Sequence, residues 1–306
     1  MYTYNSVLST TYFLVFSFSS SFCLAQHCIP ITSIPFLISK PGHYCLVKNF
    51  YYSGETHAIT INSSHVTLDL NQHKIKLISR NPSNEIYGIY SLNSHDLIIK
   101  NGTVSGFMYG VYLADSKGSY TSINSISGNY LIEHLVLTNN LFRGIRVEGA
   151  NHLVINNTII HTGGSTVYEN AFAMGIEIIG PKARIEHNRI MDTHATGTGE
   201  SIAISFSNNC KQSVALGNLI FNHYGFFEQR ARHRGNSGHS FGIWVGGNPE
   251  YPSDVVIQNN RIKNYFYGVV YSSPTKGEVS NNKFFDVDRD LYLNGSVRST
   301  AVPLTM

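Results

Sequence analysis

Short runs of apolar residues alternate with asparagine turns through most of this chain. The clearest copy, Val154–Ile160, reads apolar, apolar, Asn, Asn, polar, apolar, apolar. The same pattern returns at 184–190, 256–262 and 278–284, with looser copies at 98–104 and 214–220. Apolar residues also recur at alternate positions, as Ile176 and Ile178 do, which is the period of a β-strand and not of a helix. The pattern predicts strands of three or four residues joined by sharp turns.

A second pattern, a glycine followed by apolar, any and apolar residues, precedes each asparagine turn. Its glycines are Gly88, Gly110, Gly144, Gly175, Gly242 and Gly268. They are 22 to 34 residues apart, except for a gap of 67 after Gly175 that Ser201–Ile204 divides as a degenerate copy. Asparagine accepts the left-handed backbone conformation at little cost, and stacked coils can place one amide over the next. Two linked patterns at a near-regular spacing predict a solenoid of stacked coils.

These two patterns resemble those of the right-handed parallel β-helix in the pectin-lyase-like families, over roughly residues 55–293. The run Val66–Ile75 is similar to the opening coil of many secreted members. The resemblance implies an all-β fold, a right-handed parallel β-helix of about nine coils, which we place at residues 59–293. The same scaffold carries lyases, hydrolases, epimerases and non-catalytic binders, so the fold alone does not give the chemistry.

The composition is low in charged residues, and the first 25 residues resemble an export signal. Only 13% of the 306 residues are charged and the net charge is +3, too little to indicate a nucleic-acid partner. Residues 1–25 contain no charged side chain and end in Cys23-Leu24-Ala25, which predicts a signal peptide cleaved near Ala25. Its apolar run is too short for a transmembrane segment. We therefore expect a secreted or periplasmic protein.

Such cleavage leaves three cysteines, Cys28, Cys45 and Cys210. Cys28 and Cys45 flank a segment without the coil pattern, so in an oxidising compartment we expect a disulfide between them and an inert thiol at Cys210. We interpret residues 26–58 as an N-terminal cap, because an uncovered coil is an open strand edge. The tail, residues 294–306, shows no amphipathic helix, so that end is either exposed or covered by another subunit of an oligomer.

The insertions into the coils lie on both sides of one sheet, and the asparagine-turn corner has none. If the glycine pattern is the first strand of each coil and the asparagine turn joins the second and third, four insertions flank the first strand: 114–129, 161–174, 191–200 and 222–241. Loops held in this way by a rigid scaffold form the walls of a groove. In the families that the chain resembles, the polysaccharide lies in a groove on this sheet, which implies a polysaccharide partner here.

Strict alternation predicts which residues of the first strands face outward. In chain order they are Tyr90, Tyr112, Arg146 with Glu148, Glu177, Ala203 with Ser205, Trp244 and Val270. The tyrosines and Glu148 are candidate binding residues, and Trp244 is either a platform for a sugar ring or covered by the loop 222–241. Arg146 and Glu177 would lie on neighbouring coils, either as a structural ion pair or as part of a site.

The loop 222–241 is the most charged stretch of the chain. Its candidate residues are His223, Arg230, Arg232, Arg234 and His239. Arginine side chains bind carboxylates and sulfates in pairs of hydrogen bonds, so this loop is either a binding element for an acidic polymer or a solvated lid without a ligand. The two preceding loops contribute His194 and Tyr168.

The reaction that this set favours is attack at the acidic carbon beside a uronate carboxylate. The cation that neutralises the carboxylate would be Arg146 or Arg232. The base would be His194 or His239, and Tyr168 would protonate the leaving oxygen. If the leaving oxygen is then eliminated, the protein is a polysaccharide lyase. If a proton instead returns to the other face of the same carbon, the protein is a uronate epimerase.

Other functions remain open on the sequence. Glu148 and Glu177 would serve a glycoside hydrolase, which we rank below the lyase. The aromatic and arginine residues would equally serve a non-catalytic carbohydrate-binding protein, and a surface or adhesive solenoid would assemble through its C-terminal end. No cofactor and no metal site is predicted, because the alternating Asp286, Asp288 and Asp290 are expected to project into water.

Overall fold

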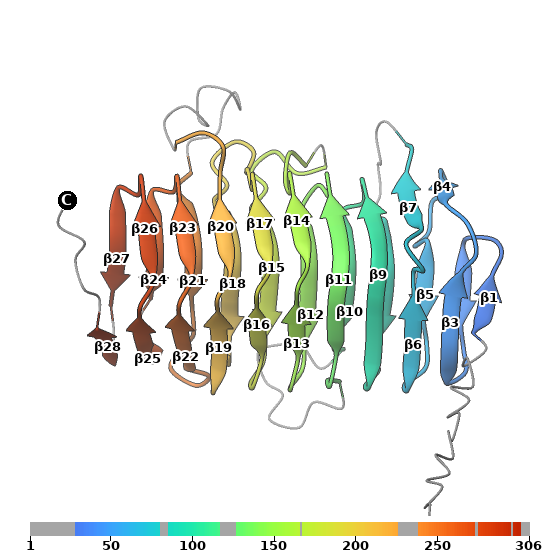
Figure 1. The fold of residues 1–306 in the computed structure, drawn as a ribbon, viewed down its shortest axis with the longest axis horizontal. Helices are drawn as coiled ribbons and strands as arrows, with labels where there is room; N and C mark the ends of the chain where they lie inside the picture. The colour runs from blue at the N-terminus through green and yellow to red at the C-terminus, as the bar shows by residue number, and fades with distance from the viewer. Residues whose placement is uncertain are drawn as a thin grey trace, which may run out of the picture.

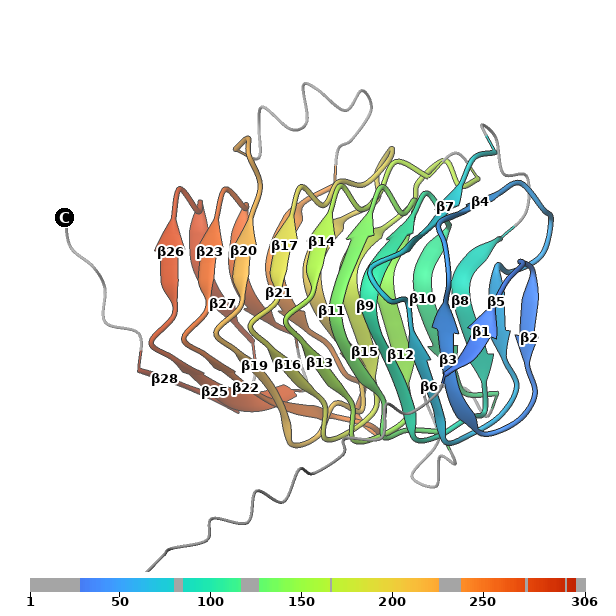
Figure 2. The ribbon, with the colours of Figure 1, turned by 45° about the vertical axis from the view of Figure 1, so that its right-hand side comes forward.

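The computed structural model describes residues 28–79, 85–116, 127–165, 167–225, 238–272, 275–294 and 296–300. The expected signal peptide and Arg230, Arg232 and Arg234 lie outside these residues. In the described part the chain is all β, wound into a right-handed parallel β-helix as expected (Figure 1, Figure 2). No helix there is long and apolar enough to cross a membrane.

One wall of the solenoid is a parallel sheet of ten strands. They are, in order, β2 (Phe36–Ile38), β5 (Ile59–Ile61), β8 (Tyr87–Leu92), β10 (Tyr109–Ala114), β12 (Arg143–Glu148), β15 (Ala173–Ile179), β18 (Ser201–Asn208), β21 (Ser240–Val245), β24 (Tyr267–Tyr271) and β27 (Arg289–Leu293). The glycine pattern lies in these strands, so they are the first strands of the coils.

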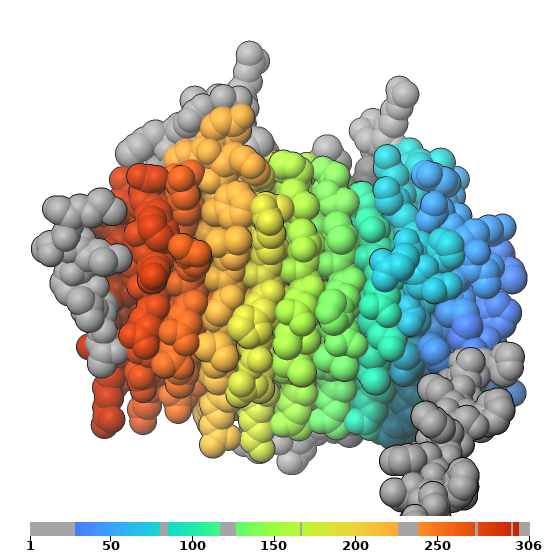
Figure 3. All heavy atoms as spheres, in the orientation of Figure 1, coloured from blue at the N-terminus to red at the C-terminus, as the bar shows by residue number. Residues whose placement is uncertain are grey.

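The other wall is a parallel sheet of eighteen strands. Most coils contribute two successive strands to it, and these stack along the solenoid in two rows, which we call the first and second lanes. The first lane contains β1 (Ile29–Ile31), β3 (Gly42–Leu46), β6 (Val66–Asp69), β13 (Leu153–Ile155), β16 (Arg184–Glu186), β19 (Ser213–Leu216), β22 (Ser253–Gln258), β25 (Thr275–Ser280) and β28 (Ser296–Thr300). The second contains β4 (Phe50–Tyr52), β7 (Lys74–Leu77), β14 (Thr158–Ile160), β17 (Arg189–Met191), β20 (Leu219–Phe221), β23 (Arg261–Lys263) and β26 (Lys283–Phe285). Strands β9 (Leu97–Ser105) and β11 (Leu131–Thr138) run through both lanes. Figure 3 shows the coils as successive coloured bands along the long axis.

The core is built from columns of branched aliphatic side chains, with one residue from each coil. Ile145 pairs in register with Ile176, which pairs with Ile204, and all three are 0% exposed. Burying such a side chain stabilises the fold by roughly 1.5–3 kcal/mol. A single coil has no neighbour to bury these residues against, so the stability of each coil depends on the next one.

The two positions of the asparagine pair have different roles: the first bends the backbone, and the second forms side-chain hydrogen bonds between coils. The first position bends the chain in the left-handed conformation, with φ of 56° at Asn156, 52° at His187, 64° at Gly217 and 58° at Asn259. These residue types differ in their side chains, but each adopts this conformation more readily than most residues or, for glycine, without steric cost. The first position therefore specifies backbone shape and not a side-chain contact.

The second position forms a ladder of amides along the solenoid, made by the buried Asn157, Asn188, Asn218 and Asn260 and the half-buried Asn282. Each Nδ2 donates to the Oδ1 of the next asparagine, at 3.0, 3.1, 2.9 and 2.9 Å in turn. Each Oδ1 from Asn188 onward also accepts the backbone N–H of the preceding ladder residue. The ladder thus satisfies buried polar groups of the turns and fixes the register between coils.

The N-terminal end is closed by the expected disulfide. Cys28 and Cys45 are bonded, and β1 pairs with β3 while β2 pairs with β5, so the disulfide-linked segment forms the first strands of both sheets. In the described residues Cys210 is the free cysteine, and it is buried. Burial raises the pKa of its thiol to about 12, which keeps it protonated and unreactive near neutral pH.

Substituting a ladder asparagine should destabilise the protein far more than substituting its neighbour in the turn. Asn188→Ala removes a side chain that donates to the Val154 carbonyl at 2.9 Å and accepts from the Asn157 backbone at 3.0 Å. We expect the free energy of unfolding to fall by about 3 kcal/mol, because several buried partners lose their hydrogen bonds together. Urea denaturation measures this difference.

The matched control is His187→Gly, on the exposed first position of the same turn. Glycine adopts the positive φ without strain, so its unfolding free energy should change by less than about 1 kcal/mol. Equal losses for the two variants would contradict the division of tasks.

Candidate functional site

The outward face of the ten-stranded sheet carries side chains from both sides of each glycine. The strand bends there, so that two successive residues face the core: a Cβ on Gly88 would meet Val104 Cγ1 at 2.4 Å, and Ile89 is 0% exposed. Tyr87 before the bend and Tyr90 after it both face outward, with ring centroids 5.5 Å apart. Strict alternation therefore predicts only part of this face.

The position before the glycine forms a second outward column that the sequence patterns did not reveal. It contains Tyr87, Tyr109, Arg143, Met174, Ile202, Phe241, Tyr267 and Arg289. The expectation that Ala203 faces outward was wrong: Ala203 aligns with Gly175 and is buried in the core, because the degenerate copy was read two residues too early. Ser205 pairs with Glu177 as the next outward residue.

Aromatic rings cover the face over β8, β10 and β12. Tyr87 meets Tyr109 edge-on at 4.8 Å, and Tyr109 stacks on Tyr112 at 4.9 Å and meets Phe142 at 5.6 Å between centroids. His57, on the preceding coil, stacks on Tyr87 at 4.5 Å. Burial lowers the pKa of His57 and raises that of Tyr109 to about 12, so both rings are uncharged near neutral pH. We name these five residues the N-terminal aromatic cluster.

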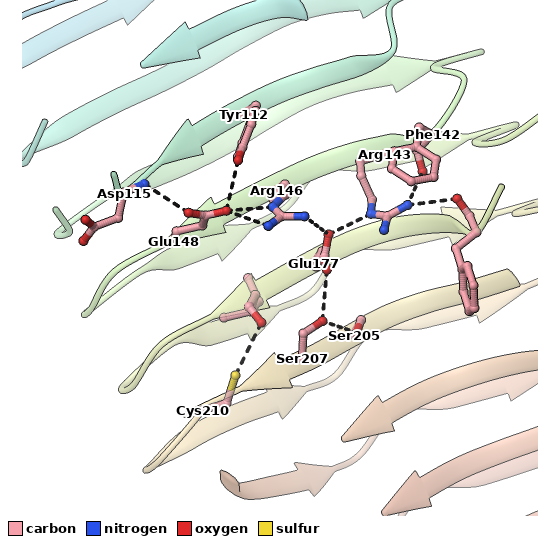
Figure 4. Close-up of polar contacts among 12 residues, drawn as sticks. Tyr112, Asp115, Phe142, Arg143, Arg146, Glu148, Glu177, Ser205, Ser207 and Cys210 are labelled. Atoms are coloured by element: carbon pink, nitrogen blue, oxygen red, sulfur yellow. Dashed lines mark hydrogen bonds and ion pairs between the residues drawn. The ribbon is translucent and has the colours of Figure 1, made fainter. Parts of the chain in front are cut away.

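Next to this cluster, four charged side chains of β12 and β15 form a buried network (Figure 4). Glu177 Oε2 accepts hydrogen bonds from Arg143 Nε at 2.7 Å and Arg146 Nη1 at 3.2 Å. Glu148 Oε1 accepts from Arg146 Nε at 2.8 Å and from the Tyr112 hydroxyl at 3.1 Å. Arg146 is 19% exposed and the other three at most 7%, so Arg146 is the member that a ligand reaches first.

The network is electrically neutral, since two carboxylates balance two guanidinium groups. Burial by itself raises the pKa of Glu177, but attraction by Arg143 and Arg146 outweighs it and holds that pKa below 4.5. Ser207 donates to the other oxygen of Glu177 at 3.1 Å. A substrate carboxylate that pairs with Arg146 would therefore compete with Glu148 and Glu177.

A second aromatic cluster covers β21 and β24. Phe241 stacks on Tyr267 at 5.1 Å with ring planes 9° apart, and Tyr267 meets Tyr292 at 5.9 Å. Trp244 is half-buried and packs against the same apolar group, which also includes the buried Val270. We name these residues the C-terminal aromatic cluster.

Titratable groups gather at the edge of the C-terminal aromatic cluster. The His239 ring stacks on Phe266 at 4.6 Å and meets Tyr267 at 5.7 Å. The Arg289 guanidinium carbon lies 5.9 Å from the first ring and 5.8 Å from the second. Glu200 takes the position equivalent to His239 on the preceding coil, because β18 and β21 pair in register, and burial raises its pKa. His239 and Arg289 thus share two aromatic neighbours, and an imidazole and a guanidinium placed in this way suit acid–base chemistry.

The other expected residues lie in the loops before β15, β18 and β21. The Tyr168 hydroxyl donates to the carboxylate of Glu85, above the N-terminal aromatic cluster. His194 Nδ1 lies 3.3 Å from the Asp192 carbonyl oxygen. His223 Nδ1 lies 2.6 Å from an oxygen of the Asp192 carboxylate and the side chain is 60% exposed.

The structure separates two of the residues that the sequence grouped into one reaction centre. Arg146 on β12 and His239 before β21 are three strand spacings apart, about 14 Å along the solenoid, which is too far for both to act on one sugar ring. Glu177 does contact Arg146, as the sequence predicted. Arg143, Arg289 and His57 were missed. Arg143 and His57 could have been found from their position one residue before the glycine or alanine of the coil, but Arg289 precedes Asp290, and only its pairing with Tyr267 places it in this column.

The buried network should stabilise the fold in a pH-dependent way. Glu177→Gln leaves Arg143 and Arg146 with one carboxylate fewer, so we expect the free energy of unfolding at pH 7 to fall by about 3 kcal/mol. Because the pKa of Glu177 is lower in the folded than in the unfolded protein, its contribution is complete above about 4.5 and is lost as pH falls through the folded pKa. The difference between wild type and variant should shrink in that acid range, as chemical denaturation at several pH values measures.

Asp286→Asn is the control, because this carboxylate is 73% exposed and contacts only Lys263 at 3.6 Å among its ion pairs in the described residues. Its substitution should change stability by less than about 1 kcal/mol. If Glu177→Gln lowered the free energy of unfolding by as little as Asp286→Asn, the network would contribute little to stability.

Comparison with known proteins supports the fold. No family model and no curated protein matches the chain. The crystal structure of an alginate lyase from Paenibacillus sp. str. FPU-7 aligns with a TM-score of 0.56 and 11% identity, over 85% of this chain and 93% of that one. A crystal structure of pectate lyase Pel9A aligns with a TM-score of 0.49 and 16% identity, over 87% and 70% of the two chains. At this identity the likeness to the alginate lyase shows that the chain has the parallel β-helix fold.

Proposed function

We propose that this protein binds a polysaccharide along the outward face of the ten-stranded sheet. The observation that carries the proposal is the continuity of that face, which runs from the N-terminal aromatic cluster across the buried network to the C-terminal aromatic cluster. From Tyr112 on β10 to Trp244 on β21 are four strand spacings, about 19 Å. A surface of this length accommodates several sugar units in a row.

Five rings on this face suit sugars because they are only partly covered, whereas Tyr87, Tyr109 and Phe241 are buried. Tyr90, Tyr112, Trp244 and Tyr267 are half-buried and Tyr292 is 46% exposed, whereas the aliphatic columns of the core are completely buried. Aromatic faces pack against the C–H faces of sugar rings, and phenol and indole groups hydrogen-bond to hydroxyls. The face thus offers both apolar and polar contacts.

We propose further that the polymer is acidic. Arg146 is the accessible member of the buried network, and Arg289 lies at the C-terminal aromatic cluster. The face therefore offers a guanidinium group to a bound carboxylate at two positions. Guanidinium groups form paired hydrogen bonds with carboxylates and sulfates. Arg230, Arg232 and Arg234 remain proposed contacts of the same kind.

Elimination or epimerisation at a uronate is a second candidate function, favoured by the groups beside Phe266 and Tyr267. Arg289 would neutralise the substrate carboxylate and His239 would take the proton from the adjacent carbon. Glu200 lies three strand spacings from Arg289, so the leaving oxygen would take its proton from solvent water. In the lyase the carbon–oxygen bond breaks as the double bond forms; in the epimerase a proton returns to the other face of that carbon.

Removing rings from the face should weaken polysaccharide binding in a graded way. Trp244→Ala and Tyr112→Ala should each raise the Kd for a bound polyuronate about 5- to 10-fold, as expected from losing roughly 1–1.5 kcal/mol of aromatic contact. Calorimetry with polygalacturonate, alginate and neutral glucans and xylans measures both affinity and the preference for acid.

Tyr51→Ala is the matched control, because Tyr51 is 63% exposed but lies on β4 of the other sheet. Its Kd should equal that of wild type. Equal weakening by all three variants would contradict the placement of the polymer, and tighter binding of the neutral glycans would contradict the acidic partner.

If the protein is a lyase, it should generate the absorbance of an unsaturated uronate from one of these polymers. His239→Ala should then lower kcat by roughly 100-fold or more, the contribution of a positioned base. His187→Asn, at the exposed asparagine-turn corner, should leave turnover unchanged. Binding without new absorbance and without solvent-proton exchange at the uronate would exclude elimination and epimerisation and leave the binding function.

A further inference from the structure

A cluster of two histidines and an aspartate lies at a corner of the solenoid that neither the polysaccharide face nor the asparagine ladder uses. This corner joins the ten-stranded sheet to the first lane of the other sheet. His65 directly precedes β6, and His95 and Asp96 directly precede β9. Because Val66 pairs with Leu97, His65 and Asp96 occupy equivalent positions on neighbouring coils.

The three side chains present one ligand atom each to a common point. Asp96 Oδ2 lies 2.7 Å from His95 Nδ1 and 3.3 Å from His65 Nδ1, and all three atoms lie within 4.8 Å of one another. In a tetrahedral zinc site with metal–ligand bonds of about 2.1 Å, neighbouring ligand atoms are about 3.4 Å apart. The observed spacing therefore needs shifts of only a few tenths of an ångström to 1.5 Å to surround an ion.

A neighbouring amide orients the carboxylate. Asn129 Nδ2 donates to Asp96 Oδ1 at 2.9 Å, which leaves Oδ2 directed at the imidazoles. Asn151 Nδ2 in turn donates to Asn129 Oδ1 at 3.1 Å. Asp96, Asn129 and Asn151 all have positive φ, of 55°, 55° and 61°, so these residues form a second corner column. Hydrogen bonds from an outer residue that fix a ligating carboxylate are a regular feature of metal sites.

The side chains of this corner column change from amides to potential metal ligands at the histidines. Farther along it, Asn151 and Asn129 pass amide hydrogen bonds from coil to coil, and Lys182 takes the next equivalent position. At His65 and Asp96 the amides are replaced by two imidazoles and a carboxylate. Among the described residues, this is the one group of three metal-ligating side chains whose ligand atoms lie so close together.

We propose that His65, His95 and Asp96 bind a zinc ion, with water at the open coordination position. Two imidazoles and one carboxylate favour Zn²⁺ over Mg²⁺ and Ca²⁺, which prefer sites made of oxygen ligands. The ion links two successive coils through side chains 31 positions apart, so it fastens the N-terminal end of the solenoid. This site goes beyond the proposed polysaccharide binding and does not depend on it.

Zinc binding to chelator-treated full-length protein tests the site. Calorimetry with ZnCl₂ should detect a site that weakens at least tenfold in His65→Ala and in Asp96→Asn. Asparagine at position 96 is compatible with the fold, since Asn129 and Asn151 hold equivalent positions, and circular dichroism should show both variants folded. Zinc should also raise the Tm of wild type but not of Asp96→Asn, because only the folded site binds the ion.

His134→Ala is the matched control. His134 also has a positive φ, of 52°, is 54% exposed, and lies 3.6 Å from a carboxylate oxygen of Glu133, but no second histidine joins them in a described metal-ligand group. Its zinc affinity should equal that of wild type. Asn129→Gly, which keeps the backbone conformation but removes the orienting amide, should weaken zinc binding about tenfold. Folded wild type without zinc binding, or equal zinc affinity in wild type and Asp96→Asn, would overturn the proposal.

Discussion

The register between successive coils is the constraint on which the rest of this structure depends, and the buried amide ladder holds it. Asn188 joins three coils, since it donates to the Val154 carbonyl behind it and to Asn218 ahead of it. A strand that slipped by one residue would lose these bonds and turn its core side chains toward solvent. The fold therefore transmits a single register from coil to coil, although the loops between them vary in length.

That register brings residues together that lie far apart in the sequence. Arg143 and Glu177 are 34 positions apart and form a hydrogen bond of 2.7 Å, because β12 and β15 are neighbours in the same sheet. The same stacking places His65 beside Asp96 at a corner. Each outward column is in effect a line of side chains about 4.8 Å apart, and its chemistry is decided by one residue choice in each coil.

The sequence was sufficient for the fold because most coils repeat the same local signals. It also predicted that Arg146 and Glu177 adjoin, since alternation holds on the far side of the glycine. Alternation did not predict the outward residue directly before the glycine. The strand bends at the glycine and turns Arg143 outward, and no apolar pattern in the sequence marks that bend. The degenerate copy around Ala203 was misaligned because no glycine stands there to fix it. The His65–Asp96 cluster was invisible for another reason, since its members belong to different coils and only the register joins them.

Trp244 allows the central claim, that a polysaccharide lies on the outward face of the ten-stranded sheet, to be tested directly. It is the only tryptophan in the 306 residues and packs within the C-terminal aromatic cluster. Titration with an acidic oligosaccharide should shift its fluorescence and reduce quenching by acrylamide, with the same Kd as calorimetry gives. Binding seen by calorimetry with the Trp244 emission and its quenching unchanged would contradict this account and place the ligand elsewhere.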